Sequence, residues 1–197
     1  MVRTAKFSDD AFLTAAVGLI ARGGPQAATI AAVARAAGAP SGSIYHRFPS
    51  RDALVARAWL TVHDGFRAAV LPPLRRGDAA GAAAALVTWA AAEPLHAAFL
   101  LPHEPEDLIG GSPPDDLRQA VAAAQEALDA AFLGFCRRAG ATAEKDVAFW
   151  RHVVFDAPVA LLRPYLRGGA PLPPWLPGLL PRVLPPLPSP LPDSLAC

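Results

Sequence analysis

The chain has 197 residues, 53% of them hydrophobic and 18% charged, with a formal net charge of +1, so it can form one large domain or two small ones. Its two cysteines, Cys136 and Cys197, are too few and too distant for a disulfide framework, and the alanine-rich run 79–92 is too short for a membrane span. Without the basic and apolar regions of a signal peptide at its N-terminus, the chain is expected to be cytoplasmic and to have no membrane partner.

The basic residues are concentrated at the N-terminal end. Residues 1–60 carry seven Lys or Arg and three Asp or Glu, whereas residues 61–197 carry eleven and fourteen. Random scatter is one explanation, and the other is a nucleic-acid-binding head on a different kind of body. The first helix of this head is expected to begin after Ser8 and to end at residues 23–25, a Gly-Gly-Pro sequence.

Two short helices joined by a glycine turn are expected next. Hydrophobic spacing predicts a helix over 29–37, with Thr29 as its N-cap and Gly38 just beyond its end. A second helix begins near Pro40 and turns Ile44 inward. This arrangement is typical of a helix-turn-helix, whose second helix enters the major groove of DNA.

The same residues resemble those of a known family. Thr29-Ile-Ala-x-Val-Ala-x-Ala-Ala-Gly, followed by Gly42-Ser-Ile-Tyr-x-x-Phe-Pro-Ser-Arg-Asp-Ala-Leu54, is similar to the DNA-binding domain of the TetR (tetracycline-repressor) family of bacterial regulators. The resemblance extends from Ala11 to about Ala58. The chain departs from the family at Pro40 and Ser41, where Ser and then Lys or Arg are common, so one phosphate or base contact is missing.

The resemblance implies that residues on and around the third helix face DNA. By their chemistry, Ser43 can hydrogen-bond either kind of base, and Arg47 can reach guanine or phosphate. Tyr45 and Arg51, with the capping residue Thr29, stand at positions similar to the family's phosphate contacts. For an isolated Arg or His, an ordinary solvated helix face is the alternative. The full set of expected DNA contacts is Thr29, Pro40, Ser41, Gly42, Ser43, Tyr45, His46, Arg47 and Arg51.

The remainder of the chain consists of apolar helical patterns separated by Pro and Gly, and no strand alternation occurs. We therefore predict an all-α fold. The expected helices cover 50–71 (stopped by Pro72 and Pro73), 78–92, 95–101, 113–138 and 142–166 (bent at Pro158), with a loop over 102–112 and a short interrupted helix within 175–184. The expected domains are a helix-turn-helix domain (1–50), a ligand-binding and dimerisation domain (51–185) and a Pro-rich tail (186–197).

No residue pattern supports catalysis or metal binding. His96 and His103 flank a loop with Glu104 and Asp107, but their spacing matches no ligand pattern of a metal site. Nucleophile elbows, phosphate-binding glycine loops and Cys–His arrangements are also missing from the sequence. We therefore predict no enzyme activity, no cofactor, no metal and no catalytic residue.

Aromatic residues in the body have two interpretations. Aromatics at helical spacing usually form core, but the resemblance implies an apolar effector pocket between body helices, and ligand sites in bundles are typically apolar with few polar groups. The predicted effector is thus a small, mainly apolar molecule. The residues expected to line its pocket are Trp89, Phe99, His103, Phe132, Trp150 and Phe155.

The segment 147–162 is apolar on nearly all sides, more than one compact body can bury alone. We therefore expect a homodimer formed through the helix 142–166 and the segment 175–184, with Val154 facing outward. Taken together, the sequence predicts a transcriptional regulator, with repression favoured, that binds double-stranded DNA at a palindromic operator and is released by the effector. The alternatives are a ligand-binding protein or enzyme with a vestigial head, and a nonspecific architectural DNA binder.

Overall fold

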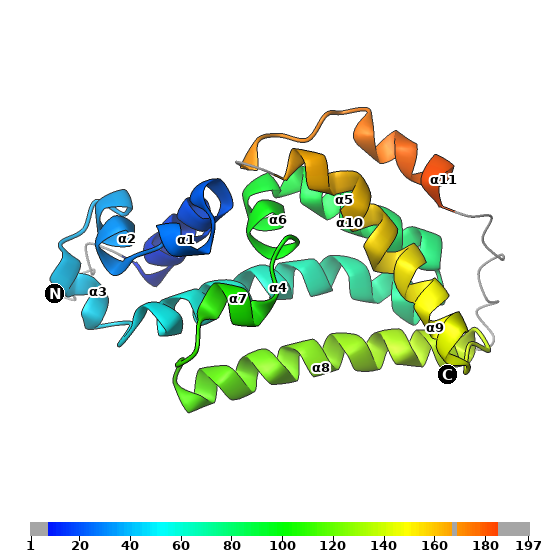
Figure 1. The fold of residues 1–197 in the computed structure, drawn as a ribbon, viewed down its shortest axis with the longest axis horizontal. Coiled ribbons are helices and arrows are strands. Elements are labelled where there is room, and N and C mark those ends of the chain that lie inside the picture. Colours follow the sequence, from blue (N-terminus) through cyan, green and yellow to red (C-terminus); the bar gives the residue numbers. More distant parts are fainter. Residues whose placement is uncertain (1–7, 167–168, 185–197) are drawn as a thin grey trace, which may run out of the picture.

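Every regular element of the protein that is described in the computed structural model, residues 8–166 and 169–184, is a helix (Figure 1). The all-α prediction is therefore confirmed. The expected Pro-rich tail, 186–197, lies outside the described residues. The head, defined here as residues 8–50, contains α1 (Asp9–Gly23), the 3-10 turn η1 (Pro25–Ala27), α2 (Ile30–Ala36) and α3 (Ser41–Tyr45).

The body, defined as residues 51–184, is built around the long helix α4, which packs against both α5 and α8 (Figure 1). Its elements are α4 (Arg51–Arg75), α5 (Ala79–Ala92), α6 (Pro94–Leu100), α7 (Pro105–Ile109), α8 (Asp115–Arg138), α9 (Glu144–Arg151), the π-helical turn η2 (His152–Asp156), α10 (Ala157–Leu162), the 3-10 turns η3 (Arg163–Tyr165) and η5 (Leu176–Leu179), and α11 (Leu180–Val183). No single described helix is both long and apolar enough to cross a membrane, although the bent pair α5 and α6 reaches that length and composition together.

Local capping begins the head helices where the sequence predicts. The Ser8 hydroxyl accepts a hydrogen bond from the amide of Ala11 at 3.2 Å, and the Thr29 hydroxyl accepts one from the amide of Ala32 at 3.1 Å. Each cap satisfies an amide that has no partner within its helix. Gly38, with φ +66°, provides the turn between α2 and α3.

A sealed apolar core holds α3 against the rest of the head. Phe12, Ile44 and Phe48 are each at most 1% exposed, and the rings of Phe12 and Phe48 meet edge to face at 6.3 Å. Leu54 at the start of α4 is fully buried in the same cluster. Because α3 is only five residues long, this packing rather than its own hydrogen bonds fixes its orientation.

Helix α4 does not end at its two prolines, as the sequence predicted, but continues through Pro72 and Pro73 to Arg75. A proline removes one backbone hydrogen bond, but its fixed φ is compatible with a helix. Burial of Pro73 and Leu74 holds the final turn, and Arg138 from α8 donates to the Leu74 carbonyl at 3.0 Å. Tertiary contacts therefore extend this helix past its expected stop.

Two further expectations are corrected by the structure. The segment 102–112 is not all loop, because Pro105 stands in the first turn of the short helix α7. The helix 142–166 changes to π-helical geometry at 152–156, just before Pro158, and ends in a 3-10 turn. Val154 lies on this turn and is fully buried rather than outward-facing, because the π-helical turn changes which residues point to the core.

Candidate nucleic-acid interface, head–body junction and ligand cleft

Helix α3 presents a small exposed surface. Tyr45 is 59% exposed, and Pro40, Gly42 and His46 are also exposed. Ser43 is half-buried, and its hydroxyl donates to the carbonyl of Pro40 at 2.6 Å. This hydroxyl is therefore used within the turn, and Tyr45 and His46 are the side chains most free to reach a duplex.

Two other predicted DNA contacts are engaged elsewhere in the head. Arg47 forms an ion pair with Asp9 on α1, and its side chain is 28% exposed. The Thr29 hydroxyl caps α2, although the residue itself is exposed. The contact with Asp9 uses Nη1 of Arg47 and orients its side chain toward α1, while the guanidinium keeps further N–H donors that a base or phosphate could accept.

Arg51, predicted to bind phosphate, instead faces the body. Its Nη2 group donates to the carbonyls of Pro25 (2.6 Å) and Leu108 (3.1 Å). Its Nη1 group donates to the carbonyl of Ile109 (3.0 Å) and to the Asp52 carboxylate (3.2 Å). These four bonds use all four terminal N–H groups of the guanidinium. In this structure the side chain thus has no terminal donor left for a phosphate.

Asp52 extends the hydrogen bonds of Arg51 within the body. Its second carboxylate oxygen accepts a hydrogen bond from the amide of Ser112 at 3.2 Å. We call Arg51 and Asp52, with the backbone groups of Pro25, Leu108, Ile109 and Ser112 that they bond, the Arg51–Asp52 clamp. Both charged side chains are mostly buried, at 25% and 22% exposure. Sequence reasoning missed the clamp because its acceptors are backbone carbonyls, which have no signature in the sequence.

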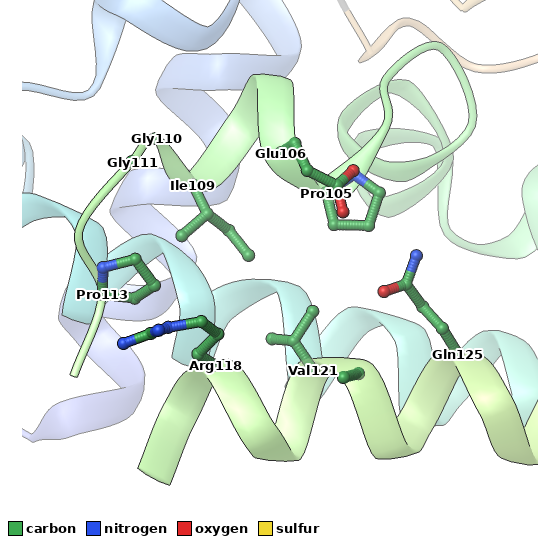
Figure 2. A pocket seen from close by; sticks show the side chains of 10 residues that line it. Pro105, Glu106, Ile109, Gly110, Gly111, Pro113, Arg118, Val121 and Gln125 are labelled. Atoms are coloured by element: carbon green, nitrogen blue, oxygen red, sulfur yellow. The ribbon is translucent and has the colours of Figure 1, made fainter. Parts of the chain in front are cut away.

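A cleft of about 400 Å³ lies beside the clamp, between α7 and α8 (Figure 2). Its walls are mainly apolar, and Ile109 at the end of α7 faces Val121 on α8. Figure 2 shows Arg118 beneath Pro113 at one end and Gln125 at the other. The residues that line the cleft are Pro105, Glu106, Ile109, Gly110, Gly111, Pro113, Arg118, Val121, Ala122 and Gln125.

A second cavity of about 580 Å³ lies where α1 meets the end of α6 and the residues that follow α10. His103 lines it, and its Nδ1 lies 3.1 Å from the carbonyl of Phe99. His103 is the predicted ligand residue that this cavity contains. Arg22 and Arg163 also line it, so this cavity is more polar than the cleft between α7 and α8.

The other five predicted ligand residues lie in the packed interior of the body and line neither cavity. Phe99 and Phe132 are fully buried, and the Phe132 ring meets Phe155 edge to face at 5.5 Å. Trp89 and Trp150 are 8% and 9% exposed. They pack mainly as core, the alternative that the sequence left open, and their contact with an effector stays a prediction.

His63 on α4 is a buried polar residue that the sequence analysis overlooked. It is 4% exposed, and its ring stacks on Trp59 at 4.2 Å. Burial, reinforced by the nearby positive charge of Arg67, lowers the pKa of His63 to about 4. His63 Nδ1, Trp59 Nε1 and Arg67 Nε have no hydrogen-bond partner among the described residues. Their common spacing of four along α4 places these groups on one helix face.

Within 8–166 and 169–184, no three His, Cys, Asp or Glu side chains converge as a metal site requires. Cys136 is buried on α8, and burial raises the pKa of its thiol. Neither observation supplies a reactive centre. The surface of α3, the clamp and the two cavities described above are therefore the candidate sites.

Comparison with known proteins identifies the head and the fold. Residues 12–58 match the sequence model of bacterial regulatory proteins of the TetR family. No curated protein sequence matches the chain significantly. Among solved structures, a protein from Shewanella sp. PV-4 described as a TetR-family transcription regulator is 24% identical, with a TM-score of 0.61 over 80% of this chain and 85% of its own.

Two proteins named FadR have the same fold. The fatty acid degradation regulator from Bacillus halodurans is 17% identical, and the transcriptional regulator from Bacillus subtilis, solved in complex with stearoyl-CoA, is 14% identical. Each has a TM-score of 0.62 over 89% of this chain and 95% of its own. Residues 12–58 thus form a DNA-binding domain of the kind found in bacterial regulators of the TetR family, and the chain as a whole shares the fold of these solved regulators.

Proposed function

We propose that this regulator is a homodimeric repressor that binds a palindromic operator and releases it when a small, mainly apolar effector binds the body. In this proposal residues 8–50 form the DNA-binding domain, and residues 51–184 form the ligand-binding and dimerisation domain. The observation that carries the proposal is Tyr45, which is 59% exposed on α3 while the adjacent Ile44 is fully buried. A rigidly packed helix thereby presents an aromatic hydroxyl outward.

The dimer is supported by exposed apolar groups on the adjoining helices α8 and α9 and on the C-terminal segment that ends in α11. Leu133 on α8 and Phe149 on α9 are 40% and 42% exposed, and Trp175 and Val183 are 53% and 48% exposed. Exposed apolar groups that recur on neighbouring elements are typical of protein interfaces. A two-fold axis through such an interface pairs two heads, and recognition helices about 34–36 Å apart read two half-sites in successive major grooves.

The operator can be identified by selecting duplexes from a random library with the full-length protein. We expect a palindromic consensus with half-sites about one helical turn apart, and two chains per bound duplex. Selection of one unrepeated half-site, or of no consensus, would contradict the proposal.

The role of Tyr45 can then be tested with the two tyrosines of the chain. Tyr45→Phe removes an exposed hydroxyl, and we expect it to weaken binding to the selected duplex and to random DNA by similar factors, because phosphate contacts carry no direct base information. Tyr165→Phe, in the body, is the matched control and should leave both affinities unchanged. A change in base preference for Tyr45→Phe would show that the hydroxyl reads a base instead.

A further inference from the structure

The segment from Ile109 to Pro113 contacts two different parts of the body, one on each side. On one side, Ile109, Gly110, Gly111 and Pro113 form part of the wall of the cleft between α7 and α8 (Figure 2). On the other side, the Ile109 carbonyl and the Ser112 amide are bonded to the Arg51–Asp52 clamp. A molecule in the cleft would therefore contact a segment that is hydrogen-bonded to the first turn of α4.

The clamp joins this wall directly to the head. Arg51 simultaneously holds the carbonyl of Pro25 in η1 and two carbonyls at the end of α7. It stands six positions after Tyr45, at the point where the head joins α4. Arg51 thus links the head to α7 through the Pro25 carbonyl, beside the packing of α1 on α4 and α6.

These bonds tolerate little movement. The Leu108 and Ile109 carbonyls lie 3.1 and 3.0 Å from the guanidinium, and a hydrogen bond is effectively lost beyond about 3.5 Å. A displacement of α7 by roughly half an ångström away from Arg51 is sufficient to release them. Since α7 has only five residues, packing against its neighbours rather than its own helical bonds holds it in place.

The cleft has the chemistry of a small-molecule site. Ile109, Val121 and Ala122 provide an apolar surface, and a volume of about 400 Å³ is within the usual range for ligand pockets. Arg118 supplies a positive charge at one end, where its partner is Asp115, a carboxylate that is itself 82% exposed. Glu106 on the α7 side carries the opposite charge. An apolar molecule with one anionic group at the Arg118 end matches this distribution.

We propose that this cleft is the effector site of the regulator, that it takes an apolar small molecule with a single anionic group, and that the segment 109–112 transmits its binding to the clamp. The proposal rests on the regulatory function proposed above and names the site and the route of its control. An occupant wedged between Ile109 and Val121 shifts α7, releases Arg51 and frees the head from its operator-binding orientation. The clamp has a closed state and a released state in this proposal. Operator DNA favours the closed state, and the effector favours the released state.

The site can be tested with 1-anilinonaphthalene-8-sulfonate (ANS), a fluorescent aromatic monoanion, and with its neutral analogue N-phenyl-1-naphthylamine. We expect one ANS molecule per chain. Ala122→Trp fills the cleft from an exposed position on α8 and should lower ANS affinity at least tenfold. Ala84→Trp, at an exposed position on α5, is the matched control and should change it less than twofold. Arg118→Gln should weaken ANS by about fivefold and leave the neutral probe unaffected.

Transmission can be tested without any ligand at two adjacent glycines. Gly110 has φ +91°, and a Cβ added there would lie 2.9 Å from the Asp52 carboxylate. A Cβ at Gly111 would meet nothing within 4 Å. Gly110→Ala should therefore disturb the clamp and weaken binding to the selected operator in the absence of ANS. Gly111→Ala, the matched control, should leave operator affinity unchanged, with circular dichroism confirming that both variants fold.

The coupling itself is measured in both directions. Saturating ANS should weaken operator binding by about 5- to 150-fold, and operator should weaken ANS binding by the same factor. If Ala122→Trp leaves ANS binding intact, the cleft assignment is wrong. If Ala122→Trp abolishes ANS binding but ANS does not change operator affinity, the regulatory role is wrong. A protein that selects no operator would refute the proposed function, whereas the ANS measurements would still decide whether the cleft binds its ligand.

Discussion

Burial of His63 makes the stability of the body dependent on pH between about 6.5 and about 4. The pKa of this histidine is lowered from 6.5 to about 4, mainly by burial and secondly by Arg67, while Asp64 opposes the shift. The folded protein therefore keeps His63 neutral at pH values where the unfolded chain protonates it. Its contribution to the free energy of unfolding is complete above about pH 6.5 and is lost as the pH falls toward about 4.

The magnitude follows from the size of the shift. Two and a half pKa units correspond to about 3 kcal/mol, of which about 2 kcal/mol is lost between pH 7.5 and pH 5.0. Urea unfolding at fixed protein concentration measures this loss. His63→Phe retains the stacking on Trp59, 4.2 Å away in the native protein, and removes the titration.

The comparison between variants isolates this residue from the carboxylates that also titrate in acid. Between pH 7.5 and 5.0, the wild type should lose about 2 kcal/mol more unfolding free energy than His63→Phe. His46→Phe, at an exposed histidine after α3, should behave as the wild type. Equal pH dependence in the wild type and His63→Phe would refute the reasoning, because it would show that the buried ring titrates as it does in the unfolded chain.

Two other predictions concern the interfaces of the regulator. Leu133→Asp places a charge at an exposed apolar position of α8 and should shift the proposed dimer toward monomers in sedimentation experiments. Thr88→Asp, at an exposed position on α5, should not. A dimer that persists in Leu133→Asp would exclude this face. Arg51→Ala should weaken operator binding without changing the slope of log affinity against log salt concentration, because a residue of the clamp releases no counterion from DNA. A slope smaller by about one would instead show that Arg51 contacts a phosphate, as the sequence predicted.

The helices of the head could be predicted well from the sequence, because their signals are local. Ser8 and Thr29 cap their helices as expected, Gly38 makes the turn, and Ile44 packs inward. Each of these depends on interactions within a few residues of the chain. Periodicity likewise predicted α8 almost to its ends, 113–138 against the observed Asp115–Arg138.

Features decided by distant contacts could not be predicted in this way. The final turn of α4 is held by burial and by Arg138, which is 64 residues away from Leu74 in sequence. The π-helical turn at 152–156 reverses the expected orientation of Val154. The aromatic residues predicted for a pocket pack largely into the core, with Phe132 against Phe155 and Trp89 against Phe66. Their spacing along a helix does not distinguish a cavity wall from a filled core.

Arg51 shows why a residue that matches a family position need not keep the same contact. The match at residues 12–58 extends through this arginine, but its terminal donors are all used by groups of the head and of α7 and by Asp52. Three of its four acceptors are backbone carbonyls, so the clamp responds to displacement of the chain rather than to side-chain rotation. The head shares its core with α4 and packs on α6, so releasing these bonds is expected to change how the head is held on the body, while burial of Phe12, Ile44 and Phe48 keeps α3 packed. In the proposed dimer, such a junction would change operator affinity through the placement of the two heads.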